Sequence, residues 1–338
     1  MSGGVDSSLT AALLKEQGYD VTGVYMKNWT QDLPGMKCPW ADDLADAKRV
    51  AVQLGIDFKV FDFENEYKQK VVDYMIEEYK MGRTPNPDIM CNQEVKFKLF
   101  LETALEDGAD MIATGHYARV ENGVLKQAVD TNKDQTYFLY RVSGEALEKT
   151  LFPLGDFTKP KVREMAAERG LYTAAKKDSQ GICFVGQIGI REFLSQYVEQ
   201  SAGSIIDKRS GKVLGQHDGA IFYTIGQRHG LELGGGLPYY VVGKDMEKNE
   251  VYVTTDLNDE NLWKPQLRLT AVHWINENPG DGDYAIRVRH RATLINATMN
   301  TEQNDTILTL EHPERAVAAG QSVVIYKGDI CLGGGIVA

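Results

Sequence analysis

The sequence predicts an α/β fold with a parallel sheet and helices on both faces, followed by a small, mostly-β central domain and a C-terminal antiparallel β-barrel. Strand-like and helix-like segments alternate up to about Ile188, which is typical of a parallel sheet. The composition then changes, and from about Pro265 short strands recur at regular spacing, as in a small barrel. The predicted domains are residues 1–188, 189–262 and 263–338.

The first domain starts with a glycine-rich turn. The apolar-periodic run after Ser7 predicts a helix that ends near Gly18. Strands are then predicted at 21–26, 58–63 and 111–114, and helices at 41–54, 66–81 and 92–107. Ligands of such sheets bind at the carboxyl ends of the strands. The glycine turn, Met26, Gly115 and His116 should therefore lie at one edge of the sheet.

The elements after Ile188 are shorter. A helix is predicted at 191–198, one hairpin at 203–216 with its turn at Ser210–Gly211, and a second at 239–255 around Lys248–Asn249. The barrel strands are predicted at 267–274, 284–289, 293–300, 306–310, 322–326 and 330–337.

Composition limits the class of protein. The chain has 338 residues, 43% of them hydrophobic and 25% charged, as in ordinary globular proteins. No apolar run approaches the roughly 18 residues of a membrane helix, and no signal peptide is apparent. The four cysteines are widely spaced without a CxxC pair, which argues against a zinc ribbon or a secreted disulfide scaffold. We expect a cytoplasmic protein.

The net charge of −11 is an objection to any nucleic-acid partner. A local basic face can still bind RNA while the rest of the surface stays acidic. The segment 287–291 holds the densest run of basic residues, although such a run can also be a solvated strand face.

The turn Ser2-Gly3-Gly4-Val5-Asp6-Ser7 is the first candidate site. Unpaired N–H groups at a helix N-terminus after a glycine-rich turn can bind phosphate. The turn is not a Walker A loop, because the G-K-[ST] ending is missing. Without that lysine, residues elsewhere in the chain must bind the β- and γ-phosphates. A glycine-rich turn alone is more often structural.

Two cysteines are candidates for thiol chemistry. Cys91 is predicted to lie just before a helix, where the dipole favours a thiolate, and Asp88 could move a proton nearby. Cys183 follows Lys176 and Lys177, whose charge would lower the pKa of its thiol. The alternative is that Asp88 caps the helix and that both cysteines are buried structural residues.

Six motifs in order then resemble tRNA-specific 2-thiouridylases, a family of the ATP pyrophosphatase-loop superfamily with an adenine nucleotide α-hydrolase-like fold. They are SGGVDSS at 2–8, YMKNW at 25–29, GRTPNPD…CN at 82–92, ATGHY at 113–117, KDQTYF at 133–138 and DSQGICF at 178–184. The CLGGG ending at 331–335 matches too. The resemblance covers essentially the whole chain, and it outweighs the structural alternatives for the cysteines.

The resemblance implies that ATP, with transient Mg²⁺, adenylates the C2 oxygen of the wobble uridine (position 34). Cys183 carries the incoming sulfur as a persulfide. Cys91 is the nucleophile that serves as the second thiol and forms a disulfide with Cys183, and Asp88 is the general acid/base. The expected partners are the Lys, Glu and Gln tRNAs and a persulfide-donating sulfur carrier or cysteine desulfurase. No membrane association and no resident metal are expected.

The resemblance also assigns binding residues. The ATP site is expected at Ser2, Gly3, Gly4, Val5, Asp6, Ser7, Met26 and Gly115. The tRNA contacts are expected at Asn86, Pro87, Asp88, His116, Lys133, Asp134, Gln135, Arg289, His290 and Gln321.

One departure and three alternatives remain. Family members place a hydrophobic strand before the glycine loop, whereas this chain begins at Met1 inside the motif, so we expect either a late start or a fragment.

The first alternative function is an enzyme that adenylates a small carboxylate or amide, which would not need Cys91 and Cys183. A non-catalytic RNA-binding protein would not need the reactive residues. The cysteine spacing and six scattered histidines do not favour a redox or metal protein.

Overall fold

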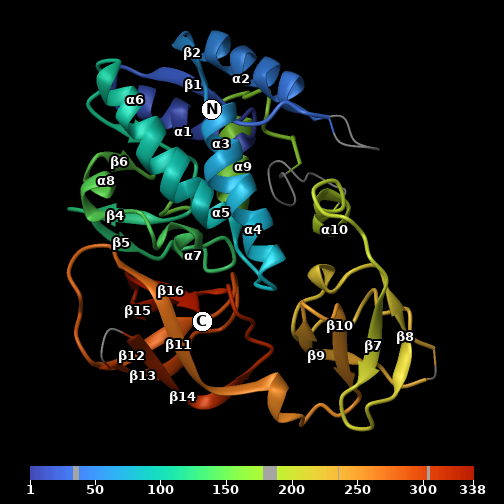
Figure 1. Ribbon diagram of the computed structural model, residues 1–338. Coiled ribbons are helices and arrows are strands. Elements are labelled where there is room, and N and C mark those ends of the chain that lie inside the picture. Colours follow the sequence, from blue (N-terminus) through green and yellow to red (C-terminus); the bar gives the residue numbers. More distant parts are fainter. Residues whose placement is uncertain (33–37, 178–188, 235, 303–304) are drawn as a thin grey trace.

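The computed structural model describes all residues except 33–37, 178–188, 235 and 303–304. The N-terminal half forms an α/β layer, a β-barrel lies directly against it, and a small four-stranded sheet stands to one side (Figure 1). Within the described part of the chain, no helix is both long enough and apolar enough to cross a membrane.

Two parallel strand pairs form the centre of the α/β layer. Strand β1 (Thr22–Lys27) pairs with β2 (Asp57–Asp62), and β3 (Ile112–Ala113) pairs with β6 (Thr150–Leu151). The two pairs are separate sheets, and the amino group of Met1 donates a hydrogen bond to the carbonyl of Val24 in β1. The expectation about a strand before the glycine loop stays untested.

Helices cover both faces of the first pair, as predicted. Helix α2 (Trp40–Leu54) packs on one face, where the Tyr25 hydroxyl donates to the carbonyl of Trp40 at 3.1 Å. On the other face, Val24 and Phe61 pack against the apolar cluster of two long helices, residues 64–80 and 87–106. The remaining helices of this layer are α1 (Val5–Glu16), α7 (Thr136–Leu139), α8 (Gly144–Glu148) and α9 (Lys159–Glu168).

Each long helix contains a π-helical segment. The first runs from α3 (Glu64–Tyr67) through Lys68–Asp73 to α4 (Tyr74–Lys80). The second runs from α5 (Pro87–Met90) through Cys91–Leu99 to α6 (Phe100–Glu106). The second helix begins at Pro87, five residues before its predicted start. Such π segments are frequent at functional sites.

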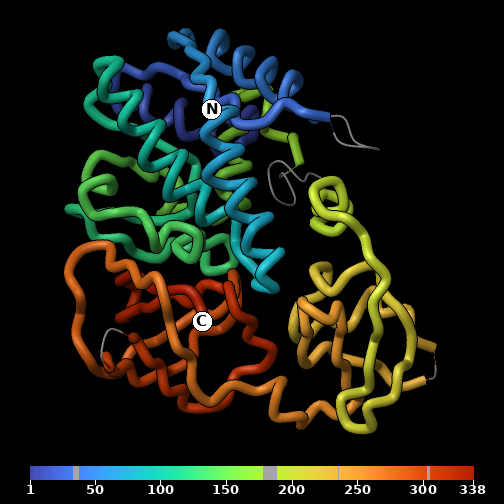
Figure 2. Tube along the Cα trace, viewed as in Figure 1, coloured from blue at the N-terminus to red at the C-terminus, as the bar shows by residue number. Residues whose placement is uncertain are grey.

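The central sheet combines the two predicted hairpins, and both are confirmed. Strands β7 (Gly203–Asp207) and β8 (Val213–His217) form one, and β9 (Tyr240–Asp245) and β10 (Glu250–Thr254) form the other. Parallel pairing of β7 with β10 joins them into one sheet. The chain enters through α10 (Ile190–Leu194) and leaves along the lower edge of the molecule toward the barrel (Figure 2).

The barrel contains the six predicted strands. They are β11 (Trp263–Trp274), β12 (Gly282–Arg287), β13 (Ile295–Glu302), β14 (Asp305–Arg315), β15 (Ser322–Lys327) and β16 (Ile330–Val337). It closes because β11 pairs with both β14 and β16. The hairpin of β4 (Arg119–Glu121) and β5 (Val124–Lys126) extends this sheet from the α/β layer, through pairing of Lys126 with Ile330.

A buried ion pair connects the barrel to the α/β layer. Arg287, the last residue of β12, donates to Asp134 at 2.7 Å, and the two side chains are 8% and 1% exposed. The Asp134 carboxylate also accepts the Thr136 hydroxyl at 2.9 Å. Close by, the hydroxyls of Tyr137 and Tyr140 donate to the carbonyl and the hydroxyl of Ser322, at 2.9 and 3.1 Å.

We predict that Arg287→Met lowers the free energy of unfolding by about 3–5 kcal/mol, because it leaves the Asp134 carboxylate buried without its cation. The measurement is urea unfolding followed by circular dichroism. Arg268→Met is the control, since Arg268 pairs with Asp305 on the surface and such pairs contribute about 1 kcal/mol or less. Equal losses in the two variants would contradict the prediction.

Candidate functional site

The glycine loop packs tightly against two neighbouring elements. Gly3 has φ of 71°, and a Cβ added there would lie 2.4 Å from the carbonyl oxygen of Asp43 in α2. A Cβ added to Gly115, just after β3, would lie 2.9 Å from the backbone nitrogen of Ser7. Both positions therefore require glycine. The loop and Gly115 meet at the ends of the strands, as the sequence predicted.

The loop leads into α1, whose first turn presents backbone N–H groups. Val5 and Leu9 are buried in an apolar cluster that includes Val162 of α9, and this packing fixes the direction of the helix. The Ser8 hydroxyl donates back to the carbonyl of Gly4 at 2.8 Å. Among the described residues no side chain caps the start of α1. This helix start can bind an anion through its N–H groups and its dipole.

Asp6 of the loop is held by two residues that were not among the predicted site residues, although one of them, Tyr117, belongs to the ATGHY motif. Lys159 Nζ lies 2.8 Å from both oxygens of the Asp6 carboxylate, and the Tyr117 hydroxyl donates to one of them at 2.9 Å. Lys159 is 8% exposed. It lies 153 positions from Asp6 at an ordinary helix start, Thr158-Lys159-Pro160, so nothing in its local sequence points to this contact.

The structure corrects the predicted surroundings of Cys91. Asn86, not Asp88, caps the helix, because its side-chain oxygen accepts from the backbone nitrogens of Asp88 and Ile89 at 3.1 and 3.3 Å. Cys91 lies in the second turn, and its own N–H bonds to the carbonyls of Pro87 and Asp88. Pro87 presets the first helical turn, and with the Asn86 cap it starts the helix before the apolar periodicity begins. The expected position of Cys91 in front of a helix is therefore wrong.

Asp88 and His116 both have shifted pKa values. Burial raises the pKa of Asp88, and the positive charge of Lys96 opposes this in part. Burial lowers the pKa of His116 well below its usual value, and Lys96 lowers it further. The His116 ring packs against Phe97 and Phe152 at centroid distances of 5.6 and 6.1 Å. Burial therefore favours the neutral form of the His116 ring.

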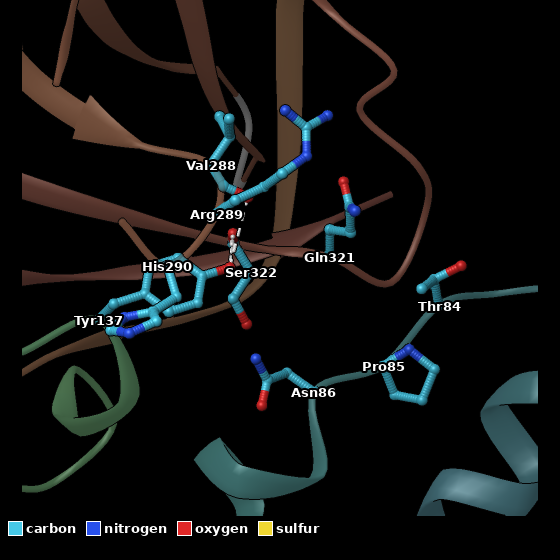
Figure 3. Close-up of a pocket in the computed structure, with 9 residues that line it drawn as sticks. All are labelled: Thr84, Pro85, Asn86, Tyr137, Val288, Arg289, His290, Gln321 and Ser322. Carbon is cyan, nitrogen blue, oxygen red and sulfur yellow. Dashed lines mark hydrogen bonds between the residues drawn. The ribbon is translucent and has the colours of Figure 1, made fainter. Parts of the chain in front are cut away.

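A cavity of about 220 Å³ lies where the loop before α5, the helix α7 and the barrel meet (Figure 3). It brings together four of the predicted tRNA-binding residues, Asn86, Arg289, His290 and Gln321. The side-chain oxygen of Asn86 caps the helix, and its amide nitrogen points toward the barrel side of the cavity (Figure 3). The other lining residues are Thr84, Pro85, Tyr137, Val288 and Ser322.

The barrel side of the cavity is held by contacts within the protein. Arg289 Nη2 donates to the carbonyls of Arg315 and Ala316, at 2.6 Å each, and Nη1 lies 3.1 Å from Glu314. The His290 ring packs against Phe138 at a centroid distance of 4.5 Å with the rings tilted by 41°, and burial together with the nearby arginines lowers the pKa of His290 to about 4. Its Nδ1 is buried without a hydrogen-bond partner among the described residues.

The remaining predicted site residues are placed differently. The Asp134 and Gln135 side chains are occupied inside the protein, because Asp134 binds Arg287 and Gln135 Oε1 accepts from the backbone nitrogen of Tyr117 at 2.9 Å. Lys133 is half-buried next to them. Met26 is half-buried near the end of β1. Cys183 lies outside the described residues.

The described residues contain no group of three or more His, Cys, Asp or Glu side chains that could hold a metal ion. The predicted tRNA contacts and catalytic roles remain predictions.

Family models match the chain in three consecutive parts. Residues 1–187 match the tRNA methyl transferase HUP domain, residues 191–255 the tRNA methyl transferase PRC-barrel domain, and residues 264–337 the aminomethyltransferase beta-barrel domain. Two curated relatives, from Bacillus cytotoxicus and Bacillus mycoides, are each named tRNA-specific 2-thiouridylase MnmA. Each is 48% identical over 342 aligned residues, which cover 99% of this chain and 92% of the relative.

A solved structure was also matched, that of a predicted subunit of tRNA methyltransferase from Methanocaldococcus jannaschii. It is 23% identical with a TM-score of 0.33, and the match covers 50% of this chain and 73% of that one. A TM-score this low supports no further conclusion.

The raised pKa of Asp88 predicts a pH-dependent stability. The folded protein holds the Asp88 proton more tightly than the unfolded chain, whose aspartates titrate at about 3.9. The ionised carboxylate therefore costs stability once the pH rises through the folded pKa. We expect Asp88→Asn to unfold at a higher temperature than wild type at pH 7.5, with the difference vanishing toward about pH 3.5.

Thermal unfolding monitored by circular dichroism at both pH values measures this difference. Asp20→Asn is the control, because Asp20 is exposed and its change should be small at either pH. A stability gain that grows as the pH falls would show that the folded protein instead favours the ionised carboxylate.

Proposed function

The chain belongs to the tRNA-specific 2-thiouridylase family, and from this premise we propose that it uses ATP to replace the C2 oxygen of the wobble uridine in tRNA with sulfur. The observation that carries the proposal is the 48% identity to named 2-thiouridylases over 99% of the chain. The glycine loop at the start of α1 and the Asn86-capped helix that bears Cys91 agree with it.

The first step of the proposed reaction activates the uridine. The C2 oxygen is a poor leaving group, so it attacks the α-phosphorus of ATP and pyrophosphate departs. Pyrophosphate would be held by the N–H groups at the start of α1, and Mg²⁺ would enter with the phosphates of ATP. The target base must leave its stack to react, as in other enzymes that modify bases.

The second step transfers sulfur. The terminal sulfur of a Cys183 persulfide attacks C2 and AMP leaves. The Cys91 thiolate then attacks the inner sulfur of Cys183, which breaks its bond to the transferred sulfur and leaves 2-thiouridine. A Cys91–Cys183 disulfide forms, and a thiol reductant returns it to two thiols with two electrons. Cys183 would be recharged by a sulfur carrier or a cysteine desulfurase.

Asp88 has the properties of a general acid/base in this scheme. Its raised pKa brings the carboxyl closer to neutral pH, where it can both give and take a proton. It lies three residues before Cys91 on the same helix, a spacing that places two side chains on one face. Cys91 is only 6% exposed, so the substrate or a loop movement must open a path to its sulfur.

The proposed RNA partner contacts the cavity lined by Asn86, Arg289, His290 and Gln321. Lys, Glu and Gln tRNAs are the proposed substrates. Side chains that use hydrogen bonds and aromatic stacking suit an unstacked, single-stranded anticodon.

The test is a thiolation assay. Purified protein is combined with ATP, Mg²⁺, a persulfide donor, a thiol reductant and unmodified tRNA, and the nucleosides are measured by mass spectrometry. We expect wild type to form 2-thiouridine at the wobble position together with AMP, while Cys91→Ser and Cys183→Ser form none because each lacks one of the two thiols. Cys331→Ala should keep activity, because the Cys331 thiol is buried and its pKa is strongly raised.

Release of AMP without sulfur in the RNA would mean that the glycine loop uses ATP but that the substrate is wrong. Full activity of the Cys91 and Cys183 variants would exclude the persulfide mechanism. An equal loss in Cys331→Ala would show that the thiol substitutions act through stability.

A further inference from the structure

The glycine loop lacks the lysine of a Walker A loop, yet a buried lysine from elsewhere in the chain reaches it. We propose that Lys159 supplies this positive charge and binds the β- and γ-phosphates of ATP and the pyrophosphate that leaves. The inference rests on the proposed function, because it assumes that the loop binds ATP.

The position of the ammonium group carries the argument. Lys159 Nζ lies 2.8 Å from both carboxylate oxygens of Asp6, and Asp6 belongs to the first turn of α1. The ammonium also lies 5.6 Å from the centre of the Tyr117 ring. It therefore lies beside the first turn of α1, whose backbone N–H groups would receive the phosphates.

The chemistry of the loop requires such a cation. Asp6 is the acidic residue of the sequence MSGGVDSS, and an ionised carboxylate beside the phosphates would repel them. Lys159 compensates that charge, so the positive end of the α1 dipole stays available for the anion. The Lys159 side chain is 10% exposed and the Asp6 side chain 32%, and an ion pair that is partly desolvated in this way contributes little net stability. Binding of a ligand gives this one a role beyond stability.

Packing of α9 fixes the position of Lys159 relative to the glycine loop. The backbone nitrogen of Lys159 donates to the Asp130 carboxylate at 2.8 Å, which fixes the start of α9. Val162 and Met165 of α9 are buried in the cluster that also contains Leu9 of α1. The two helices are thus packed together, and the ammonium is positioned before any nucleotide arrives.

The same helix provides a matched control. Lys161 lies two residues after Lys159, but it is 47% exposed and pairs with Glu164 at 3.1 Å within one turn. Substitution of Lys161 removes a positive charge from the same helix without touching the loop.

Calorimetric titration of the purified full chain with Mg²⁺-ATP, pyrophosphate and AMP, without tRNA, tests the inference. Loss of one charged contact should weaken binding by about 10- to 100-fold. We expect Lys159→Met to lose this much affinity for ATP and pyrophosphate and less than about threefold for AMP, which lacks the β- and γ-phosphates. Lys159→Arg should retain most of the affinity, and Lys161→Met should match wild type.

Wild-type affinity for pyrophosphate in Lys159→Met would overturn the inference. Equal losses for AMP and pyrophosphate would also overturn it, because they would show that Lys159 only shapes the loop. If circular dichroism shows that Lys159→Met is unfolded, Lys159→Gln takes its place, and normal pyrophosphate binding there excludes a role for the charge. A wild type that binds neither ATP nor pyrophosphate would instead refute the proposed function itself.

Discussion

The ion pair between Asp134 and Arg287 is the constraint on which the cavity depends. It joins a loop of the α/β layer to the end of β12, and the backbone that follows carries Arg289 and His290. The Tyr137 hydroxyl fixes the neighbouring strand through Ser322. Since these bonds are buried, the barrel residues have a set position relative to the Asn86 cap. The cavity is thus assembled from segments about 200 residues apart, 86 and 289, by contacts that are themselves out of reach of the solvent.

A second pair, Asp6 with Lys159, in which only the lysine is buried, plays the corresponding role for the glycine loop. In both places a carboxylate that the family resemblance assigns to ligand binding is already held by a cation from a distant segment. Burial makes the Asp134–Arg287 pair sensitive to the loss of one partner, because the remaining charge would have no hydration, whereas Asp6 is 32% exposed and would keep part of its hydration. The charge that is available to a ligand is therefore set by the pair and not by either residue alone.

These pairs also mark the limit of prediction from sequence. Strands β1, β2 and β3, the two hairpins of the central sheet and the six barrel strands were predictable, since alternation and turn residues are local signals, whereas the short strands β4, β5 and β6 were not predicted. The start of the Cys91 helix at Pro87 was missed because apolar periodicity begins only later, although the Asn86-Pro87 cap was visible in the sequence. Lys159 and the burial of Asp134 depend on contacts across more than 150 residues, and no local pattern records them.

The positive charge of the barrel segment 287–291 has to be reconsidered in this light. Arg287 neutralises Asp134, and Arg289 is bound to two carbonyls and to Glu314, whereas Arg291 is exposed. Most of the positive charge of the segment 287–291 is therefore already paired with groups of the protein itself. In a chain of net charge −11, the proposed RNA binding at the cavity would then not rest mainly on release of counterions. Under that proposal, binding would come from shape, stacking and hydrogen bonds to unstacked bases, which favours a flexible single-stranded loop over a duplex.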